Sequence, residues 1–202
     1  MELGTNLKLG TTHAGIILAA GASSRMGQPK ALLPTREGLP LALQQVRLLM
    51  EAGYAPVTVV LGCDAHLIQP KLGSCSVVWN RNWKKGRFGS ILAGLKTVQG
   101  AVGVLILPVD TVGISGDTLA RIRHYADTIK PPVIRPMYQG KNGKVLWLSA
   151  AVAEHLLSLP IHEDMRLDQI IEAQAILFEV DDPAILSNIN TPADWDAHFK
   201  TT

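Results

Sequence analysis

Short, continuously apolar runs alternate along the chain with longer stretches whose apolar residues recur at helical spacing. The short runs are rich in β-branched residues, a pattern typical of strands that are buried on both faces. They predict strands at residues 15–20, 56–62, 75–80, 102–108, 131–136, 144–149 and 175–180. Helical spacing is clearest at residues 41–53, 88–98 and 115–129.

Strands that alternate with helices form a sheet covered by helices on both faces, and such a sheet is largely parallel. The expected fold class is therefore α/β, with a helix layer on each side of the sheet. Ser115 stands where the N-cap of the third helix belongs. One side of the first helix is expected to be apolar and buried, and it carries Leu41, Val46, Leu49 and Met50.

Length and composition restrict the class of protein. The 202 residues predict one domain at residues 13–202, after a flexible N-terminal leader at residues 1–12. Apolar residues make up 47% and charged residues 18%, which argues against a disordered chain. The net charge of +2 does not indicate a nucleic-acid or membrane partner. Two cysteines, Cys63 and Cys75, without a signal sequence predict a cytoplasmic protein.

The first predicted strand runs into a loop with two glycines and two cations. Five residues separate Gly21 from Gly27, and Lys30 does not follow directly, so the loop is not of the Walker type. The dinucleotide pattern Gly-x-Gly-x-x-Gly is absent as well. Glycine amides can still approach a phosphate, Arg25 can bind two of its oxygens, and Lys30 adds a mobile charge. On these residues alone, a solvated surface loop is an equally good interpretation.

Asp110 directly follows the fourth predicted strand. In sheets of this kind, ligands bind outside the carboxyl ends of the strands, where the glycine loop also lies. Magnesium is held by one or two carboxylates together with water and substrate phosphates. Asp110 is therefore a candidate Mg²⁺ ligand, and the alternative is an aspartate that only initiates a turn.

Residues 18–30, LAAGASSRMGQPK, closely resemble the motif Leu-Ala-Ala-Gly-x-Ser-x-Arg-Met-Gly-x-x-Lys of the MobA-like nucleotidyltransferases. These are NTP transferase domains similar to molybdenum-cofactor cytidylyl- and guanylyltransferases. The resemblance implies a three-layer α/β/α, Rossmann-like mixed sheet of the nucleotide-diphospho-sugar transferase type. It also implies that the backbone from Leu18 to Gly21 reads the base, while Arg25 and Lys30 hold the triphosphate.

Further segments carry the resemblance more weakly. Residues 80–95 resemble the family segment Asn-x-x-Trp-x-x-Gly-x-x-x-Ser-x-x-x-Gly-Leu, which implies that this segment approaches the base or ribose. The resemblance also implies that Asp110 binds the metal, so Mg²⁺ is the expected cofactor. The expected catalytic residues are Arg25, Lys30 and Asp110. The expected nucleotide-binding residues are Leu18, Ala19, Ala20, Gly21, Ser23, Arg25, Gly27, Lys30, Asn80 and Ser90.

The chain departs from the family pattern in three places. Val112 replaces the proline of Asp-x-Pro, and Gly143-Lys144-Val145 replaces Gly-His-Pro. Asn188 and Asn190 stand where the family has aspartates in Asp-Ile-Asp-Thr-Pro. An asparagine oxygen can bind a hard cation, so Asn188 is a candidate second metal ligand. The following Thr191-Pro192 is expected to start the last helix.

The expected reaction is transfer of NMP from a nucleoside triphosphate to an anionic phosphate acceptor such as molybdopterin cofactor, with release of pyrophosphate. Ala20 favours CMP, because guanylyl relatives tend to have glycine there and a larger residue narrows the approach to the base. Lys84, Lys85 and Arg87 can attract an anionic second substrate or form a solvated face. The alternatives are a sugar-phosphate or other small-phosphate nucleotidyltransferase, and a catalytically weak nucleotide-binding maturation factor that serves a molybdoenzyme.

Overall fold

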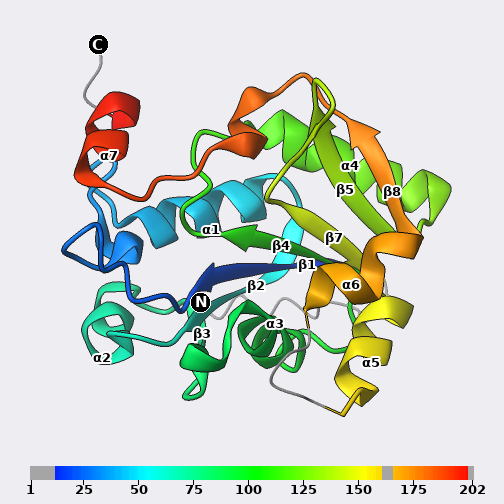
Figure 1. Ribbon diagram of the computed structural model, residues 1–202, viewed down its shortest axis with the longest axis horizontal. Coiled ribbons are helices and arrows are strands. Elements are labelled where there is room, and N and C mark those ends of the chain that lie inside the picture. The colour runs from blue at the N-terminus through cyan, green and yellow to red at the C-terminus, as the bar shows by residue number, and fades with distance from the viewer. Residues whose placement is uncertain (1–11, 161–165, 200–202) are drawn as a thin grey trace, which may run out of the picture.

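The computed structural model describes residues 12–160 and 166–199. The strands in this part form one eight-stranded sheet in the order β3-β2-β1-β4-β7-β5-β6, with β8 paired to β5 (Figure 1). The strands are β1 (His13–Ala19), β2 (Tyr54–Leu61), β3 (Ser76–Trp79), β4 (Gly103–Pro108), β5 (Val133–Tyr138), β6 (Lys141–Asn142), β7 (Leu146–Ser149) and β8 (Ala175–Glu179). All seven predicted strands are present, with boundaries shifted by one or two residues. The short and exposed β6 was not predicted.

The sheet is mixed and mostly parallel, as expected. Strands β3, β2, β1 and β4 run parallel to one another, and β8 runs parallel to β5. Strand β7 is antiparallel to both β4 and β5, and β6 is antiparallel to β5. Because β1 and β4 are parallel neighbours, the loops that follow them leave the sheet at the same edge.

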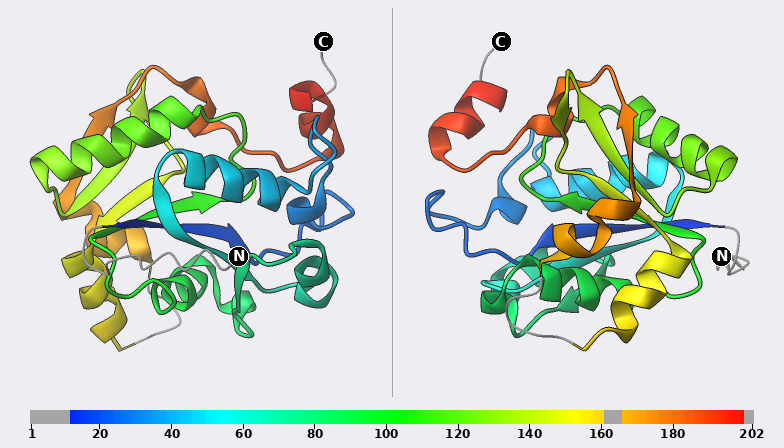
Figure 2. Two further views of the ribbon diagram at one scale, coloured as in Figure 1. Left: turned by 180° about the vertical axis from the view of Figure 1, so that it is seen from behind. Right: turned by 45° about the vertical axis from the view of Figure 1, so that its right-hand side comes forward.

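Helices cover both faces of the sheet, which confirms the predicted three layers. Helices α1 and α4 lie on one face, and α3, α5 and α6 lie on the other (Figures 1 and 2). Helix α7 lies near the carboxyl ends of β1 and β4. The helices are α1 (Leu41–Glu51), α2 (Ala65–Ile68), α3 (Arg87–Leu95), α4 (Gly116–Ile129), α5 (Ala150–Ser158), α6 (Leu167–Ile171) and α7 (Pro192–Phe199).

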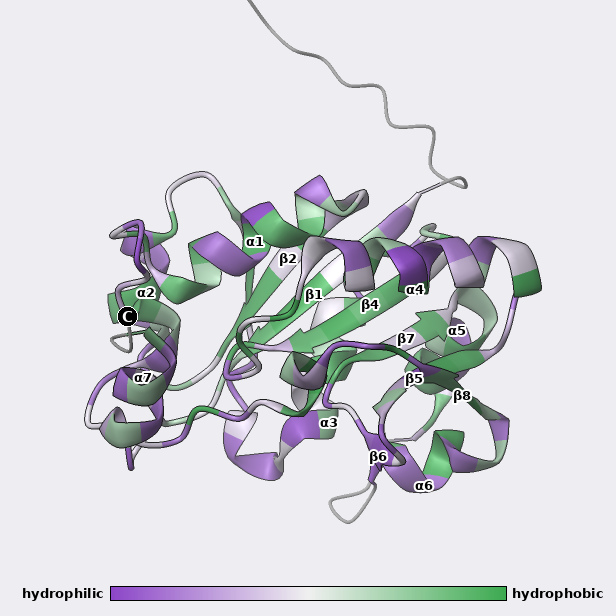
Figure 3. Ribbon diagram, turned by 90° about the horizontal axis from the view of Figure 1, so that it is seen from above, coloured by the Kyte–Doolittle hydropathy of each residue, from purple (hydrophilic) through white to green (hydrophobic). Residues whose placement is uncertain are grey.

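Two hydrophobic cores explain why the strand segments are apolar at successive positions. Ile17 and Leu105 pack on the side of α1 and α4, whereas Ile16 and Val104 pack on the side of α3 and α5. Successive side chains of a strand point to opposite faces, so a strand covered on both faces needs apolar residues throughout. The central strands are accordingly the most continuously hydrophobic elements in Figure 3.

The helix predictions are confirmed with one correction. The Ser115 side chain accepts a hydrogen bond from the Thr118 N–H, as an N-cap does. Leu41, Val46 and Leu49 are buried, but Met50 is 59% exposed and does not belong to the buried side of α1. Met50 lies one position after Leu49, about 100° further around the helix, and this turns it towards solvent. Helix α5, which follows β7 directly, was not predicted.

A closed polar network lies at the amino end of β1. Trp147 Nε1 donates to His13 Nδ1 at 3.1 Å, and His13 Nε2 lies 2.8 Å from Asp127 Oδ1. Because Nδ1 accepts a hydrogen bond, the ring proton belongs on Nε2, which donates to the carboxylate. The Tyr54 hydroxyl donates to the Leu119 carbonyl at 2.9 Å, and burial raises its pKa far above the usual value. These bonds join β1 to α4 and β7, and β2 to α4.

The predicted leader at residues 1–12 lies almost entirely outside the described residues, so the domain boundary at residue 13 stays a prediction. Among the residues described, no helix combines the length and apolarity required to cross a lipid bilayer.

Candidate functional site

The glycine loop leaves the carboxyl end of β1 and turns back towards the sheet at Lys30. Ser23 (φ 51°) and Gly27 (φ 75°) both adopt left-handed backbone conformations, which glycine tolerates far better than other residues. The Ser23 hydroxyl accepts a hydrogen bond from the Lys30 N–H at 3.1 Å, and its carbonyl accepts one from Met26. A Cβ at Gly21 would lie more than 4 Å from every protein atom outside its two neighbouring residues. The loop therefore presents open backbone next to two cations.

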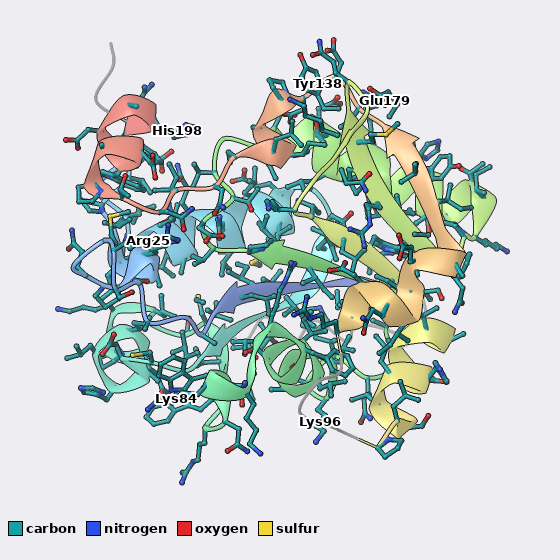
Figure 4. All side chains as sticks on the ribbon, in the orientation of Figure 1. Arg25, Lys84, Lys96, Tyr138, Glu179 and His198 are labelled. Atoms are coloured by element: carbon teal, nitrogen blue, oxygen red, sulfur yellow. The ribbon has the colours of Figure 1, made fainter. Side chains whose placement is uncertain are left out.

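The Lys30 side chain points into the protein, where it meets the predicted metal ligand. It is only 10% exposed, and its Nζ lies 2.9 Å from Asp110 Oδ2. The same ammonium donates to Asn190 Oδ1 at 3.0 Å, and Arg25 donates to that oxygen, also at 3.0 Å. Two cations, one carboxylate and one amide thus form a single network with an excess of positive charge. Figure 4 labels Arg25 on the side of the molecule where α7 lies.

Asn190 was identified from the sequence only as a departure from the family pattern, and the structure brings it into this network. Its Nδ2 donates to the Asn188 carbonyl, and its backbone N–H donates to Asp194. Asp194 also accepts from the Thr191 N–H and donates its own N–H to the Thr191 hydroxyl, a reciprocal cap for α7. These backbone hydrogen bonds hold the pKa of Asp194 below its usual value. The start of α7 therefore fixes the position of Asn190.

The segment that carries the two asparagines is tied to the loop after β4. The Ile189 N–H donates to the Asp110 carbonyl at 2.9 Å. The Ser187 hydroxyl accepts from the Val112 N–H and donates to the Val112 carbonyl, both at 2.7 Å. A proline at position 112 would lack this N–H, so the valine in its place forms a connection that the family pattern excludes.

A cavity of about 490 Å³ opens beside this network. Its wall combines the end of β1, the start of α3 and both candidate metal ligands, Asp110 and Asn188. The lining residues are Leu18, Ala20, Gly21, Trp83, Lys84, Gly86, Arg87, Ser90, Pro108, Asp110, Lys144 and Asn188. A hollow of about 100 Å³ beside it is lined by several further loop residues, among them Ala19, Ser23 and Lys30.

Ser90 and Asn80 have different positions relative to this cavity. Ser90 lines it, whereas Asn80 does not belong to the lining residues and donates through Nδ2 to the Ser90 hydroxyl at 3.0 Å. Asn80 Oδ1 accepts from the Asn82 backbone, so its amide also shapes the turn before α3. A Cβ at Gly62 would lie 2.6 Å from the Ala20 carbonyl oxygen, so this glycine lets β2 approach the loop closely.

A second cavity, of about 570 Å³, adjoins the first and is lined by five cationic side chains. They are Lys85, Arg87, Arg135, Lys144 and Arg166. Asp168 also lines it and accepts a hydrogen bond from Arg135 at 2.7 Å. The excess of positive charge makes this cavity suited to an oxyanion.

The chemistry of the oxygen donors fits Mg²⁺. Asp110 supplies a carboxylate that is 29% exposed, and Asn188 lines the same cavity. Magnesium keeps several waters and takes one or two carboxylates plus substrate phosphate oxygens, so this small donor set is adequate. No cluster of three or more His, Cys, Asp or Glu side chains occurs in the described part of the chain that could hold a metal without a substrate.

The fold and this arrangement define a class of nucleotide-binding α/β protein, and the comparison with known families gives its identity. Residues 15–177 match the family described as the MobA-like NTP transferase domain. Because the match covers most of the chain, the chain belongs to this family of nucleotidyltransferases, as the glycine-loop motif predicted.

Curated relatives carry several names. The molybdenum cofactor guanylyltransferase of Xanthomonas euvesicatoria is 27% identical over 193 residues, which cover 90% of this chain and 91% of that protein. The molybdenum cofactor cytidylyltransferase of Escherichia coli is 26% identical over 190 residues, with coverages of 89% and 92%. The nicotine blue oxidoreductase of Paenarthrobacter nicotinovorans is 35% identical over 111 residues, but this match spans only 54% of either protein.

Solved structures share the fold at low sequence identity. A nucleotidyl transferase from Methanothermobacter thermautotroptrophicus has a TM-score of 0.76 at 24% identity and covers 94% of this chain and 96% of its own. Rv0371c from Mycobacterium tuberculosis has a TM-score of 0.76 at 23% identity, with coverages of 95% and 98%. These likenesses confirm the predicted fold class.

Proposed function

We propose that this protein transfers a nucleoside monophosphate, preferably CMP, from a nucleoside triphosphate to an anionic phosphate acceptor such as molybdopterin. The observation that carries the proposal is the network in which Lys30 bonds Asp110 and Asn190, and Arg25 bonds Asn190. Asp110 joins this network to the wall of the 490 Å³ cavity. A triphosphate needs several positive charges at one end and a base pocket at the other. The glycine loop and this cavity supply both.

In the proposed reaction, an oxygen of the acceptor phosphate forms a bond to the α-phosphorus of the triphosphate. The bond from the α-phosphorus to the oxygen that bridges to the β-phosphorus breaks, and pyrophosphate leaves with both electrons of that bond. This chemistry requires alignment and charge neutralisation rather than a protein nucleophile. Arg25 and Lys30 neutralise the β- and γ-phosphates, and the open backbone of the glycine loop binds their oxygens.

Magnesium is the proposed cofactor, and Asp110 and Asn188 are the residues that would hold it. When bound, it would neutralise phosphate oxygens and help pyrophosphate to leave. Lys30 already bonds the Asp110 carboxylate at 2.9 Å, so this lysine helps to orient a carboxylate that lines the cavity. The anionic acceptor occupies the neighbouring cationic cavity in this proposal, because that cavity combines five cations with Asp168.

The proposed preference for CTP rests on Ala20, which lines the 490 Å³ cavity and is 7% exposed. One methyl group changes discrimination by about 10- to 200-fold in a closely fitting pocket. Ala20→Gly should therefore raise binding of GTP relative to CTP. Competition between the two triphosphates for the wild type and the variant measures the change, and an unchanged ratio would remove Ala20 from the specificity argument.

The activity itself is tested by pyrophosphate release from CTP, GTP and ATP with Mg²⁺ and a panel of phosphate acceptors. The panel contains molybdopterin and several sugar phosphates, so it also tests the alternative substrate class. We expect release with CTP that depends on both Mg²⁺ and an acceptor. Triphosphate binding without turnover on any acceptor would contradict the proposed activity and support a nucleotide-binding maturation factor.

A further inference from the structure

The two cavities share part of one wall, and this shared wall contains an arginine. Gly86, Arg87 and Lys144 line both the 490 Å³ and the 570 Å³ cavity. We propose that Arg87 is a catalytic residue that binds the anionic acceptor and the nucleotide at the same time and so holds the two reacting anions together. This inference rests on the proposed function, since it assigns one substrate to each cavity.

The position of Arg87 is defined by contacts on two separate segments. Arg87 is the first residue of α3, and its guanidinium donates to the Lys144 carbonyl at 3.3 Å. The Lys144 backbone is itself held in place, because its N–H donates to the Ile185 carbonyl at 2.9 Å. A guanidinium has five N–H donors in a planar fork, so this bond leaves donors for substrate oxygens on both sides. Lys144 replaces the histidine of the family pattern.

The charges around Arg87 favour anions in both of the cavities that it lines. Among the described residues that line either cavity, Asp110 and Asp168 are the only carboxylates, against six lysines and arginines. Arg87 lines both the cavity that contains the candidate metal ligands and the cationic cavity, and Asp110 and Asp168 both act electrostatically on it. Arg87 is exposed on the cavity wall, and partial desolvation lowers its pKa, yet an arginine remains charged at neutral pH.

Local structure gives no reason for an arginine at this position. The partial positive charge of a helix N-terminus favours acidic residues, yet the first turn of α3 contains none and begins with Arg87. A residue that violates a local preference at a cavity wall is typical of a functional position. Removal of its charge should not destabilise α3, so a loss of ligand binding in a variant is not a consequence of unfolding.

The test measures binding of inorganic phosphate, as a probe for the acceptor phosphate, by ³¹P NMR titration. Each variant is titrated alone and after saturation with α,β-methylene-CTP, which cannot release pyrophosphate. The variants are Arg87→Met, Asp168→Asn and the control Lys96→Met. Lys96 is exposed and directly follows the last residue of α3 (Figure 4). Lys96→Met therefore removes one positive charge at the other end of the same helix.

We expect Arg87→Met to weaken phosphate binding about ten-fold in the presence of the analogue, which is the effect of losing one charge-assisted bidentate contact. The loss should be larger with the analogue than without it, because Arg87 no longer offsets the repulsion between the two anions. Asp168→Asn should strengthen phosphate binding, since the carboxylate competes for Arg135. Lys96→Met should change the affinity by less than two-fold.

Equal phosphate affinities for Arg87→Met and Lys96→Met would overturn the assignment of Arg87. An equal loss with and without the analogue would overturn the bridging role and leave a simple anion contact. The experiment distinguishes a failure of the role proposed for Arg87 from a failure of the proposed function. A protein that shows nucleotide-dependent phosphate binding through Arg87 but no turnover contradicts only the reaction, whereas turnover that is insensitive to Arg87→Met contradicts only this inference.

Discussion

Polar side chains gather at both ends of the central strands β1 and β4, and the two groups differ in how their charges are used. At the amino end, His13 is 4% exposed and is placed between Trp147 and Asp127. At the carboxyl end, Lys30 is almost as buried, but its partner Asp110 lines the open 490 Å³ cavity.

The polar network at the amino end of the strands serves stability, whereas the network at the carboxyl end is suited to ligand binding. Hydrogen bonds at the amino end join β1, α4 and β7 and therefore stabilise the sheet. At the carboxyl end, cations outnumber carboxylates in a region accessible to a ligand, and a bound anion can balance this excess. Substitutions at the amino end should lower stability and leave activity unchanged. Substitutions at the carboxyl end should lower activity and leave stability nearly unchanged.

The largest effect is expected for Asp110→Asn, which removes charge and keeps an oxygen that can accept from Lys30. Turnover should fall about 1,000-fold, because one electrostatic contact to a transition state is worth several kcal/mol. The free energy of unfolding should change by less than about 1 kcal/mol. Steady-state pyrophosphate release and urea unfolding measure the two quantities. Glu154→Gln, an exposed charge loss on α5, is the matched control. Turnover above a third of the wild-type rate would reject Asp110 as a catalytic residue.

The second expected effect is at the opposite end of the sheet. His13→Ala leaves the Trp147 N–H without its acceptor and a cavity in the core, and Asp127 keeps only its bond from Arg123. The free energy of unfolding should fall by about 2–4 kcal/mol, with unchanged turnover at temperatures where the variant is folded. His124→Ala, on the exposed side of α4, should change stability by less than about 0.5 kcal/mol. A loss of turnover in folded His13→Ala would contradict the separation of the two ends.

The third prediction concerns the link between α4 and the segment that carries the asparagines. Burial alone would raise the pKa of Asp182, but hydrogen bonds from Ser115, Thr118 and Ala184 lower it overall. Because the folded pKa is depressed, its stabilisation is complete above the unfolded pKa of about 3.9 and is lost as pH falls through the folded value. Asp182→Asn should therefore cost about 1–3 kcal/mol at pH 7, and the difference from wild type should shrink below about pH 4. Urea unfolding across pH tests this, and a difference that stays constant down to pH 2 would contradict it.

The smallest expected effect is that of Asn190→Asp. A carboxylate at this position would accept the same hydrogen bonds from Arg25 and Lys30 but would neutralise part of their charge. Triphosphate binding should weaken about five-fold, or about 1 kcal/mol, while Mn²⁺ binding should become stronger. Calorimetric titrations of CTP and of Mn²⁺ measure both affinities. Gln99→Glu adds an exposed charge elsewhere and is the control. Tighter triphosphate binding by Asn190→Asp would show that excess charge is not what the asparagine preserves.

Local pattern was sufficient for most of the secondary structure and for the loop motif. The strands are buried on both faces, so their sequences are apolar throughout and easy to recognise. Exposed β6 lacks this signal. The position of Met50 shows the limit of helical spacing, because a residue next to the buried side can still face solvent. For Asn190, a local signal did exist, since the sequence at the start of α7 departs from the family pattern.

The α/β class, the family and the identity of the cations and the carboxylate at the strand ends could be predicted from the sequence, because these depend on residues that are neighbours in the chain. Which of these groups meet could not be predicted in this way and follows from the packing of distant segments. Lys30 contacts Asp110 across 80 positions and Asn190 across 160, and no local preference encodes a contact at such separations. The parallel pairing of β1 with β4 and the capped start of α7 bring the three together. For Arg87 the sequence left two alternatives, attraction of an anionic second substrate or a solvated face, and the structure places it on the wall of both cavities.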